Sequence, residues 1–119
     1  MKYTYTFDQL KDCPGENTSR LFLDYKSTVR CFGGVDLTRY ITADHGTIEA
    51  HTPQMACEKL YLIYNAEKPE GYRGRSMSVS DIVTLWDNSV EPPQKSTWFC
   101  DSFGFKLLKD SSCESVAKE

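Results

Sequence analysis

The sequence lacks the features that mark several large classes of protein. No apolar run approaches the roughly 20 residues that a membrane-spanning helix needs. The first residues, MKYTYTFDQLKD, contain no apolar stretch of the kind that directs export, so we expect no secretion. Positive charge is not in excess, because 14 Lys and Arg residues face 17 Asp and Glu residues. This balance excludes a protein that binds nucleic acid by overall positive charge.

Closely spaced pairs of metal ligands are also missing. No C-x-x-C pair occurs among the five cysteines, which are Cys13, Cys31, Cys57, Cys100 and Cys113. Structural zinc sites draw on such pairs, so we expect free thiols in a reducing compartment, with no metal and no cofactor. His45 and His51 have no ligand partner at metal spacing, and we expect both at the surface. A Cys–His nucleophilic pair stays open as an alternative, since only geometry identifies one.

The sequence does contain enough apolar material for one folded domain. Hydrophobic residues make up 39% of the 119 residues and aromatic residues 13%, so a sizeable core can form. Residues 110–119 show little periodicity and are expected to be a flexible tail. Residues 1–109 are therefore predicted to form a single domain.

The first third of the chain predicts one strand and one short helix. Residues 2–7 alternate, which places Tyr3, Tyr5 and Phe7 on one face of a half-buried strand. Asp24 is a suitable N-cap for a helix that Gly33 ends, because glycine accepts the left-handed conformation past a helix end.

The next segment predicts a strand pair and the strongest helix. Residues 39–43 and 47–51 are expected to be strands joined by a tight turn at residues 44–46. Thr52 suits an N-cap and Pro53 the first helical position. The expected buried stripe of this helix is Ala56, Leu60, Ile63 and Tyr64.

The last third predicts a hairpin with a loose tip. Residues 82–86 and 97–100 are rich in β-formers and are separated by a loop that contains Pro92 and Pro93. Phe103 and Phe105 are expected to be core anchors. The whole pattern predicts an α+β fold: a single small domain with a mainly antiparallel twisted sheet and one or two helices packed on one face.

Two blocks of sequence are more specific than this pattern. They are GYRGRSMSVSDIV at residues 71–83 and WFCDSFGF at residues 98–105. Together they resemble the YodL-like domain family, in which P-x-x-[FY]-x-G-x-S-[LM]-S-V-S-D-[IV]-[IV] precedes a hairpin and a strand ending in D-S-F-G-F. The resemblance covers residues 60–106, and Arg75 stands where the family often has His. The matching motif positions are Pro69, Tyr72, Gly74, Ser76, Ser78, Ser80, Asp81, Asp101, Ser102, Phe103, Gly104 and Phe105.

The resemblance implies a function without implying chemistry. Such domains are small accessory modules on conjugative elements, plasmids and phages of Gram-positive bacteria, with no enzymatic activity established for the class. Proteins of this setting include anti-CRISPR proteins. The resemblance thus implies a cytoplasmic bacterial interaction protein that inhibits a host defence system. The expected partner is a CRISPR effector nuclease or its ribonucleoprotein complex, whose nucleic-acid or guide RNA loading it would block. A scaffold module acting in conjugation is an alternative.

The serine and aspartate positions of the motif have two interpretations. In the first, Ser80 and Asp81 form a local turn that holds the loop on the sheet, and Asp101 and Ser102 do the same at the end of the next strand. In the second, Asp81 and Asp101 converge to bind a divalent metal, as in a metal-dependent nuclease. A third acidic ligand at metal spacing is missing, which favours the first.

Five residues are candidates for partner binding. Tyr72, Arg73 and Arg75 lie on a glycine-containing loop, and Tyr and Arg are the residue types that dominate protein-binding surfaces. Contact with a nucleic-acid backbone is an alternative for this loop, and a solvated loop with paired arginines is another. Trp86 and Trp98 are expected to face each other across the hairpin, mainly as a packing pair.

Overall fold

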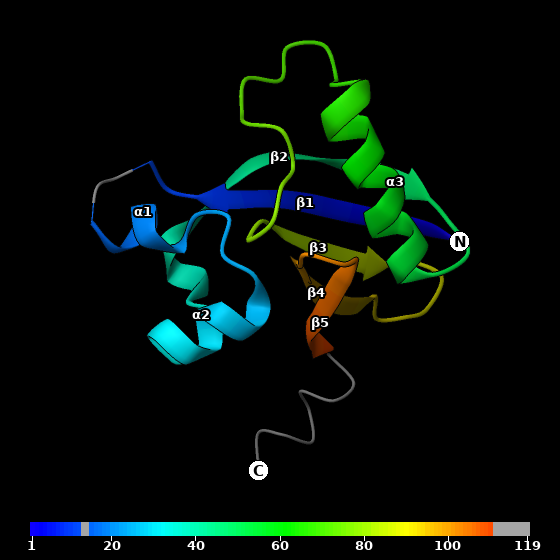
Figure 1. The fold of residues 1–119 in the computed structure, drawn as a ribbon. Coiled ribbons are helices and arrows are strands. Elements are labelled where there is room, and N and C mark those ends of the chain that lie inside the picture. Colours follow the sequence, from blue (N-terminus) through cyan, green and yellow to red (C-terminus); the bar gives the residue numbers. More distant parts are fainter. Residues whose placement is uncertain (13–14, 111–119) are drawn as a thin grey trace.

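The computed structural model describes residues 1–12 and 15–110. Figure 1 shows one sheet with a long helix across one face and two short helices gathered at one end. In chain order the elements are β1 (Lys2–Leu10), α1 (Glu16–Arg20), α2 (Tyr25–Phe32), the 3-10 helix η1 (Leu37–Arg39), β2 (Tyr40–Glu49), α3 (Pro53–Ala66), β3 (Ile82–Asp87), β4 (Gln94–Cys100) and β5 (Phe105–Asp110).

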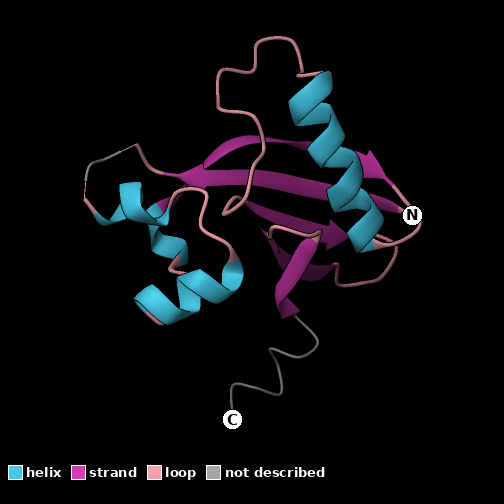
Figure 2. Cartoon of the chain, viewed as in Figure 1, coloured by secondary structure: helices cyan, strands magenta, loops and turns pink. Residues whose placement is uncertain are grey.

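The five strands form a single antiparallel sheet in the order β2-β1-β3-β4-β5. β1 therefore occupies an interior position, and β2 and β5 are the two edges (Figure 2). The predicted α+β fold with a mainly antiparallel sheet is confirmed.

The main core lies between the sheet and α3. The strand residues on this face include Tyr3, Tyr5, Phe7, Val83 and Leu85. The helix contributes the predicted stripe, since Ala56, Leu60 and Tyr64 are fully buried and Ile63 is partly buried, together with Cys57. Thr52 caps the helix as predicted, because its side chain accepts a hydrogen bond from Met55 N–H.

The helix α2 covers part of the opposite face at one end of the sheet. Asp24 accepts the Ser27 N–H at 2.8 Å, and Gly33 adopts the left-handed conformation, so the predicted start and end of this helix are confirmed. The Tyr25 ring packs edge-to-face on Phe99, 5.8 Å between ring centres. The five-residue helix α1 was not expected from the sequence.

Three local expectations are wrong. β2 is one continuous ten-residue strand paired with β1, so residues 44–46 form no turn. Trp86 and Trp98 lie on opposite faces of the hairpin, because Trp98 pairs with Val83 and Trp86 pairs with Lys95. Phe103 is 95% exposed and is no core anchor, whereas Phe105 packs against the core.

The end of the domain differs slightly from the expected boundary. Asp110 is the last residue of β5 and so belongs to the sheet, while the rest of the expected tail, residues 111–119, lies outside the described residues. Cys13 and Cys113 also lie outside them. Cys57 and Cys100 are buried free thiols, and Cys31 is exposed. No helix within residues 1–12 and 15–110 is long and apolar enough to cross a bilayer.

Candidate functional site

The serine-rich motif ends in a hydrogen-bonded turn before β3. Asp81 N–H donates to the Ser78 carbonyl, and Ser78 N–H donates to Asp81 Oδ2 at 2.9 Å. Ser80 adopts a positive φ of 89°, and its hydroxyl accepts the Phe22 N–H at 3.1 Å. Side-chain bonds of this kind hold the loop against its neighbours. This is the local turn that the first interpretation of the motif describes.

The Asp81 carboxyl is fully buried, and within the described part of the chain only one of its two oxygens accepts hydrogen bonds. Besides the Ser78 N–H, Oδ2 accepts a long bond from Gln9 Nε2 at 3.4 Å, while Oδ1 has no hydrogen-bond partner within the described part of the chain. Burial raises the pKa of Asp81 to about 7, and the two hydrogen bonds and the charge of Arg75 oppose this only in part.

The second aspartate of the motif has a different structural task. Asp101 Oδ1 accepts the N–H of Tyr25, the first residue of α2, and the N–H of Ser102. Asp81 thus accepts a backbone N–H of its own turn, whereas Asp101 accepts the backbone N–H groups of α2 and of the residue that follows it. No group of three His, Cys, Asp or Glu side chains among residues 1–12 and 15–110 is arranged to hold a metal ion.

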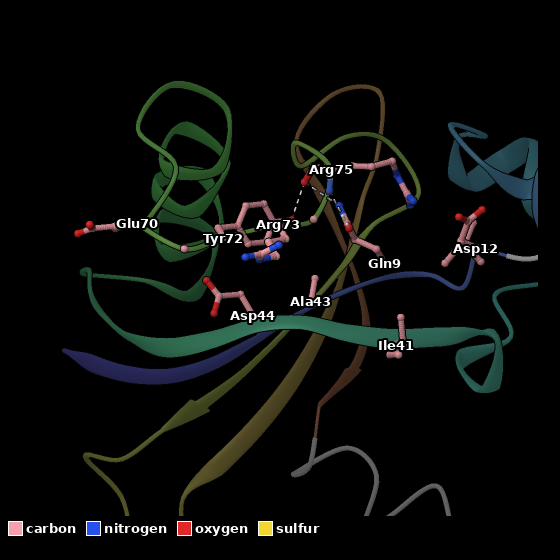
Figure 3. A pocket seen from close by; sticks show the side chains of 12 residues that line it. Gln9, Asp12, Ile41, Ala43, Asp44, Glu70, Tyr72, Arg73 and Arg75 are labelled. Carbon is pink, nitrogen blue, oxygen red and sulfur yellow. Dashed lines mark hydrogen bonds between the residues drawn. The ribbon is translucent and has the colours of Figure 1, made fainter.

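The loop of residues 70–75 overhangs β2 and encloses a cleft of about 490 Å³. Figure 3 shows Tyr72 and Arg73 above the β2 residues Ala43 and Asp44, with Gln9 beneath the backbone of Arg75. Gln9 fixes this loop, because Nε2 donates to the Arg75 carbonyl at 2.9 Å and Oε1 accepts the Arg75 N–H at 3.2 Å.

The three loop candidates for binding differ in how accessible they are. Tyr72 is a loop anchor, since its ring packs against Phe7 and Tyr64 and its hydroxyl donates to the Arg75 carbonyl at 2.5 Å. The Nε and Nη2 atoms of Arg75 are buried and find no hydrogen-bond partner among residues 1–12 and 15–110. Only Arg73 is fully at the surface. Gly74 fits here because a Cβ would collide with the Tyr72 ring.

The tryptophans occupy two unlike environments. Trp98 is 7% exposed and packs in the core, so it offers no surface to a partner. Trp86 is partly exposed on the opposite face, where the Lys95 ammonium lies 5.8 Å from its ring centre. It borders a shallow groove whose walls include Thr6, Thr84 and Thr97.

An apolar groove beside the second motif block was not foreseen from the sequence. It has a volume of about 490 Å³ and lies between α3 and the turn that precedes β5. Phe103 at the tip of this turn is 95% exposed, and Leu62 and Tyr61 on α3 are 65% and 41% exposed. The turn is closed by the Asp101 N–H, which donates to the Gly104 carbonyl. We name Phe103, Leu62 and Tyr61 the apolar surface.

Comparison with known proteins assigns the fold to a family. A family model for the YodL-like domain matches residues 4–110, nearly the whole chain. The chain belongs to the YodL-like domain family. No curated protein and no solved structure matches it.

The two motif blocks of this YodL-like domain meet in the structure. Ser80 N–H donates to the Cys100 carbonyl and Cys100 N–H donates to the Asp81 carbonyl, so the end of the first block pairs with the start of the second. Most of the motif therefore holds the domain together. Phe103 is different, because its side chain faces solvent and supports nothing inside the domain.

Proposed function

We propose that this YodL-like domain is a non-enzymatic interaction protein of a mobile genetic element, acting in the bacterial cytoplasm. It binds and inhibits a host defence system, most directly a CRISPR effector nuclease, by blocking nucleic-acid or guide RNA loading. The observation that carries the proposal is Phe103, a motif residue that presents a 95% exposed ring on a hydrogen-bonded turn.

An exposed aromatic ring at a fixed position is a binding feature. Burial of a phenylalanine side chain contributes about 2–3 kcal/mol, and a few such side chains supply most of the affinity of a protein interface. Leu62 and Tyr61 extend the same patch along α3. The turn is already ordered in the free chain, so binding spends little free energy on fixing it.

The rim of the apolar surface favours a basic partner. Glu58 and Asp101 border the groove. Acidic groups around an apolar centre complement the positive charge that nucleic-acid channels carry, and they speed association with such surfaces. This supports a surface that competes with nucleic acid for a nuclease channel. The engagement of Asp81 and Asp101 with backbone N–H groups supports a role without hydrolytic chemistry.

The test is cleavage of target DNA by CRISPR effector nucleases, with the purified protein added before or after guide RNA. We expect inhibition that Phe103→Ala weakens at least tenfold, because the loss of the ring removes about 2 kcal/mol of burial. Val90→Ala is the matched control, since Val90 is exposed on the far hairpin loop. Stronger inhibition when the protein is added first indicates a block of guide RNA loading.

Failure of the proposal has a clear form. No inhibition and no complex with any effector on a sizing column would contradict it. Recovery of conjugation proteins in a pull-down from cells carrying the parent element would favour the scaffold role instead. Inhibition that Phe103→Ala leaves unchanged would remove the apolar surface from the mechanism.

A further inference from the structure

The edge strand β2 carries an open row of backbone groups. It is the longest strand and it pairs on one side only. It contains no proline and no lysine, two of the devices that discourage edge pairing, although it does carry a bulge at Ala43 and the charged Asp44. Among the described residues, the backbone of residues 41–48 makes only one hydrogen bond outside the ladder with β1, in which His45 N–H donates to Asp44 Oδ1. This edge can therefore accept another strand.

The sequence of β2 is self-complementary when it is read in the antiparallel direction. With His45 placed opposite His45 of a second copy, and with Ala43 left unpaired as it is against β1, Thr47 lies opposite Thr42 and Ile48 lies opposite Ile41. Like β-branched residues thus meet at matching positions on both sides of the centre. Pairs of this kind stabilise antiparallel strands.

The register with β1 shows that these pairs also share a face. Ile41 and Ile48 lie opposite Gln9 and Tyr3, on the face that α3 covers. Thr42 and Thr47 lie opposite Asp8 and Thr4, on the other face. In an antiparallel pair, opposing residues must lie on one face of the sheet.

The irregularity in β2 makes this match possible. The register shifts between Phe7 and Asp8, which leaves Ala43 as an extra residue of β2. Without the shift, Ile41 and Ile48 would lie on opposite faces, because they are seven positions apart and successive side chains of a strand alternate between faces. With it, Ala43 and Asp44 together oppose Gly46 of the second copy, which has no side chain to crowd the bulge.

We infer that two copies of this chain associate through β2, antiparallel about a two-fold axis at His45, to form one continuous ten-stranded sheet. A second copy is favoured over an unrelated strand because the pairing pattern repeats itself under the two-fold operation, as an isologous interface requires. The other edge fits less well, because β5 has six residues and carries Lys106.

The neighbouring loop leaves room for this association. The side chains of Ile41, Ala43 and Asp44 line the open cleft of Figure 3, so the loop of residues 70–75 does not pack down on this part of β2. The apolar surface lies between α3 and β5, at the opposite side of the sheet order. Dimerisation and the proposed partner binding therefore use separate surfaces.

The experiment measures molar mass by size exclusion with light scattering over a range of protein concentrations. The wild-type mass is expected to rise from 13.6 kDa towards twice that value as concentration increases. His45→Lys places like charges opposite each other at the axis and should raise the dimer dissociation constant about fivefold or more. The matched control, His45→Thr, places an uncharged β-former at the axis and should still dimerise.

A charge-reversal pair tests the register itself. Thr42→Lys with Thr47→Lys places lysines opposite each other at both ends of the ladder, and this variant should be monomeric. Thr42→Lys with Thr47→Glu places opposite charges there and should dimerise. Circular dichroism confirms that each variant is folded. A wild-type mass of 13.6 kDa at the highest soluble concentration would overturn the inference, as would a dimer that none of these changes affects.

Discussion

Removal of the buried charge at Asp81 should make the protein more stable at neutral and alkaline pH. The carboxyl is 0% exposed, it accepts two hydrogen bonds on Oδ2, and Oδ1 has none. In Asp81→Asn, the amide oxygen can accept the Ser78 N–H, and the amide nitrogen takes the place of Oδ1. The substitution therefore changes charge with little change in shape.

The magnitude follows from proton linkage. Burial raises the pKa of Asp81 from 3.8 to about 7, so the folded chain holds a proton that the unfolded chain has released between these pH values. Stability is then greatest below about pH 4 and falls as the pH rises through about 7. A pKa difference of about three units between the folded and unfolded chain corresponds to about 4 kcal/mol of stability. This is a large part of the ~5–15 kcal/mol that stabilises a typical domain.

Three opposing contributions are already included in this pKa and do not reverse its shift. The Ser78 N–H, the Gln9 bond and the charge of Arg75 all favour the ionised carboxylate. Arg75 makes no hydrogen bond with Asp81, however, and the Gln9 bond is long at 3.4 Å. Desolvation therefore dominates, and we expect the free energy of unfolding of Asp81→Asn to exceed that of the wild type by on the order of 4 kcal/mol at about pH 8.

The assay is urea unfolding followed by tryptophan fluorescence from about pH 4 to about pH 8. The wild type should lose stability across this range, whereas Asp81→Asn should lose much less. The two proteins should agree within about 1 kcal/mol at the acidic end, where the wild-type carboxyl is neutral. The remaining titratable groups, including Asp8, are common to both proteins, so their contributions cancel in the difference.

The opposite pH trend would refute this reasoning. If the wild type gained stability with rising pH and Asp81→Asn removed the gain, the carboxyl would be ionised and paired in the folded chain. Arg75 is the partner that such a result would indicate.

Two further predictions concern α3 and the cysteines. Leu60→Ala should lower the free energy of unfolding by about 2–5 kcal/mol, measured in urea, because Leu60 is fully buried. Leu62→Ala should change it by less than about 0.5 kcal/mol, since Leu62 is 65% exposed. Equal losses of stability in the two variants would contradict the assigned helix faces. In the native protein the exposed Cys31 should react rapidly with a thiol reagent. Cys57 and Cys100 should react only on unfolding, because both are buried. Burial also raises the pKa of the Cys100 thiol to about 12, which keeps it protonated. Mass spectrometry that finds native Cys57 or Cys100 modified as fast as Cys31 would show that the core opens.

The elements that could be predicted from the sequence are those with local physical causes. The strand at β1 follows from alternation, and α2 and α3 follow from their capping residues Asp24 and Thr52. The turn at Ser78–Asp81 follows from the tendency of Ser and Asp side chains to bond to nearby backbone. Each cause acts within a few residues, so the sequence alone determines it.

The remaining features depend on which segments meet in space. Asp44–Gly46 has the composition of a turn, yet pairing with the whole of β1 keeps β2 extended, and Gly46 leaves space for the Tyr5 ring. The exposure of Phe103 could not be predicted, because an apolar residue predicts burial unless the closing turn is known to point outward. Local interactions thus determined the elements of this protein, and long-range strand pairing determined which side chains were left exposed.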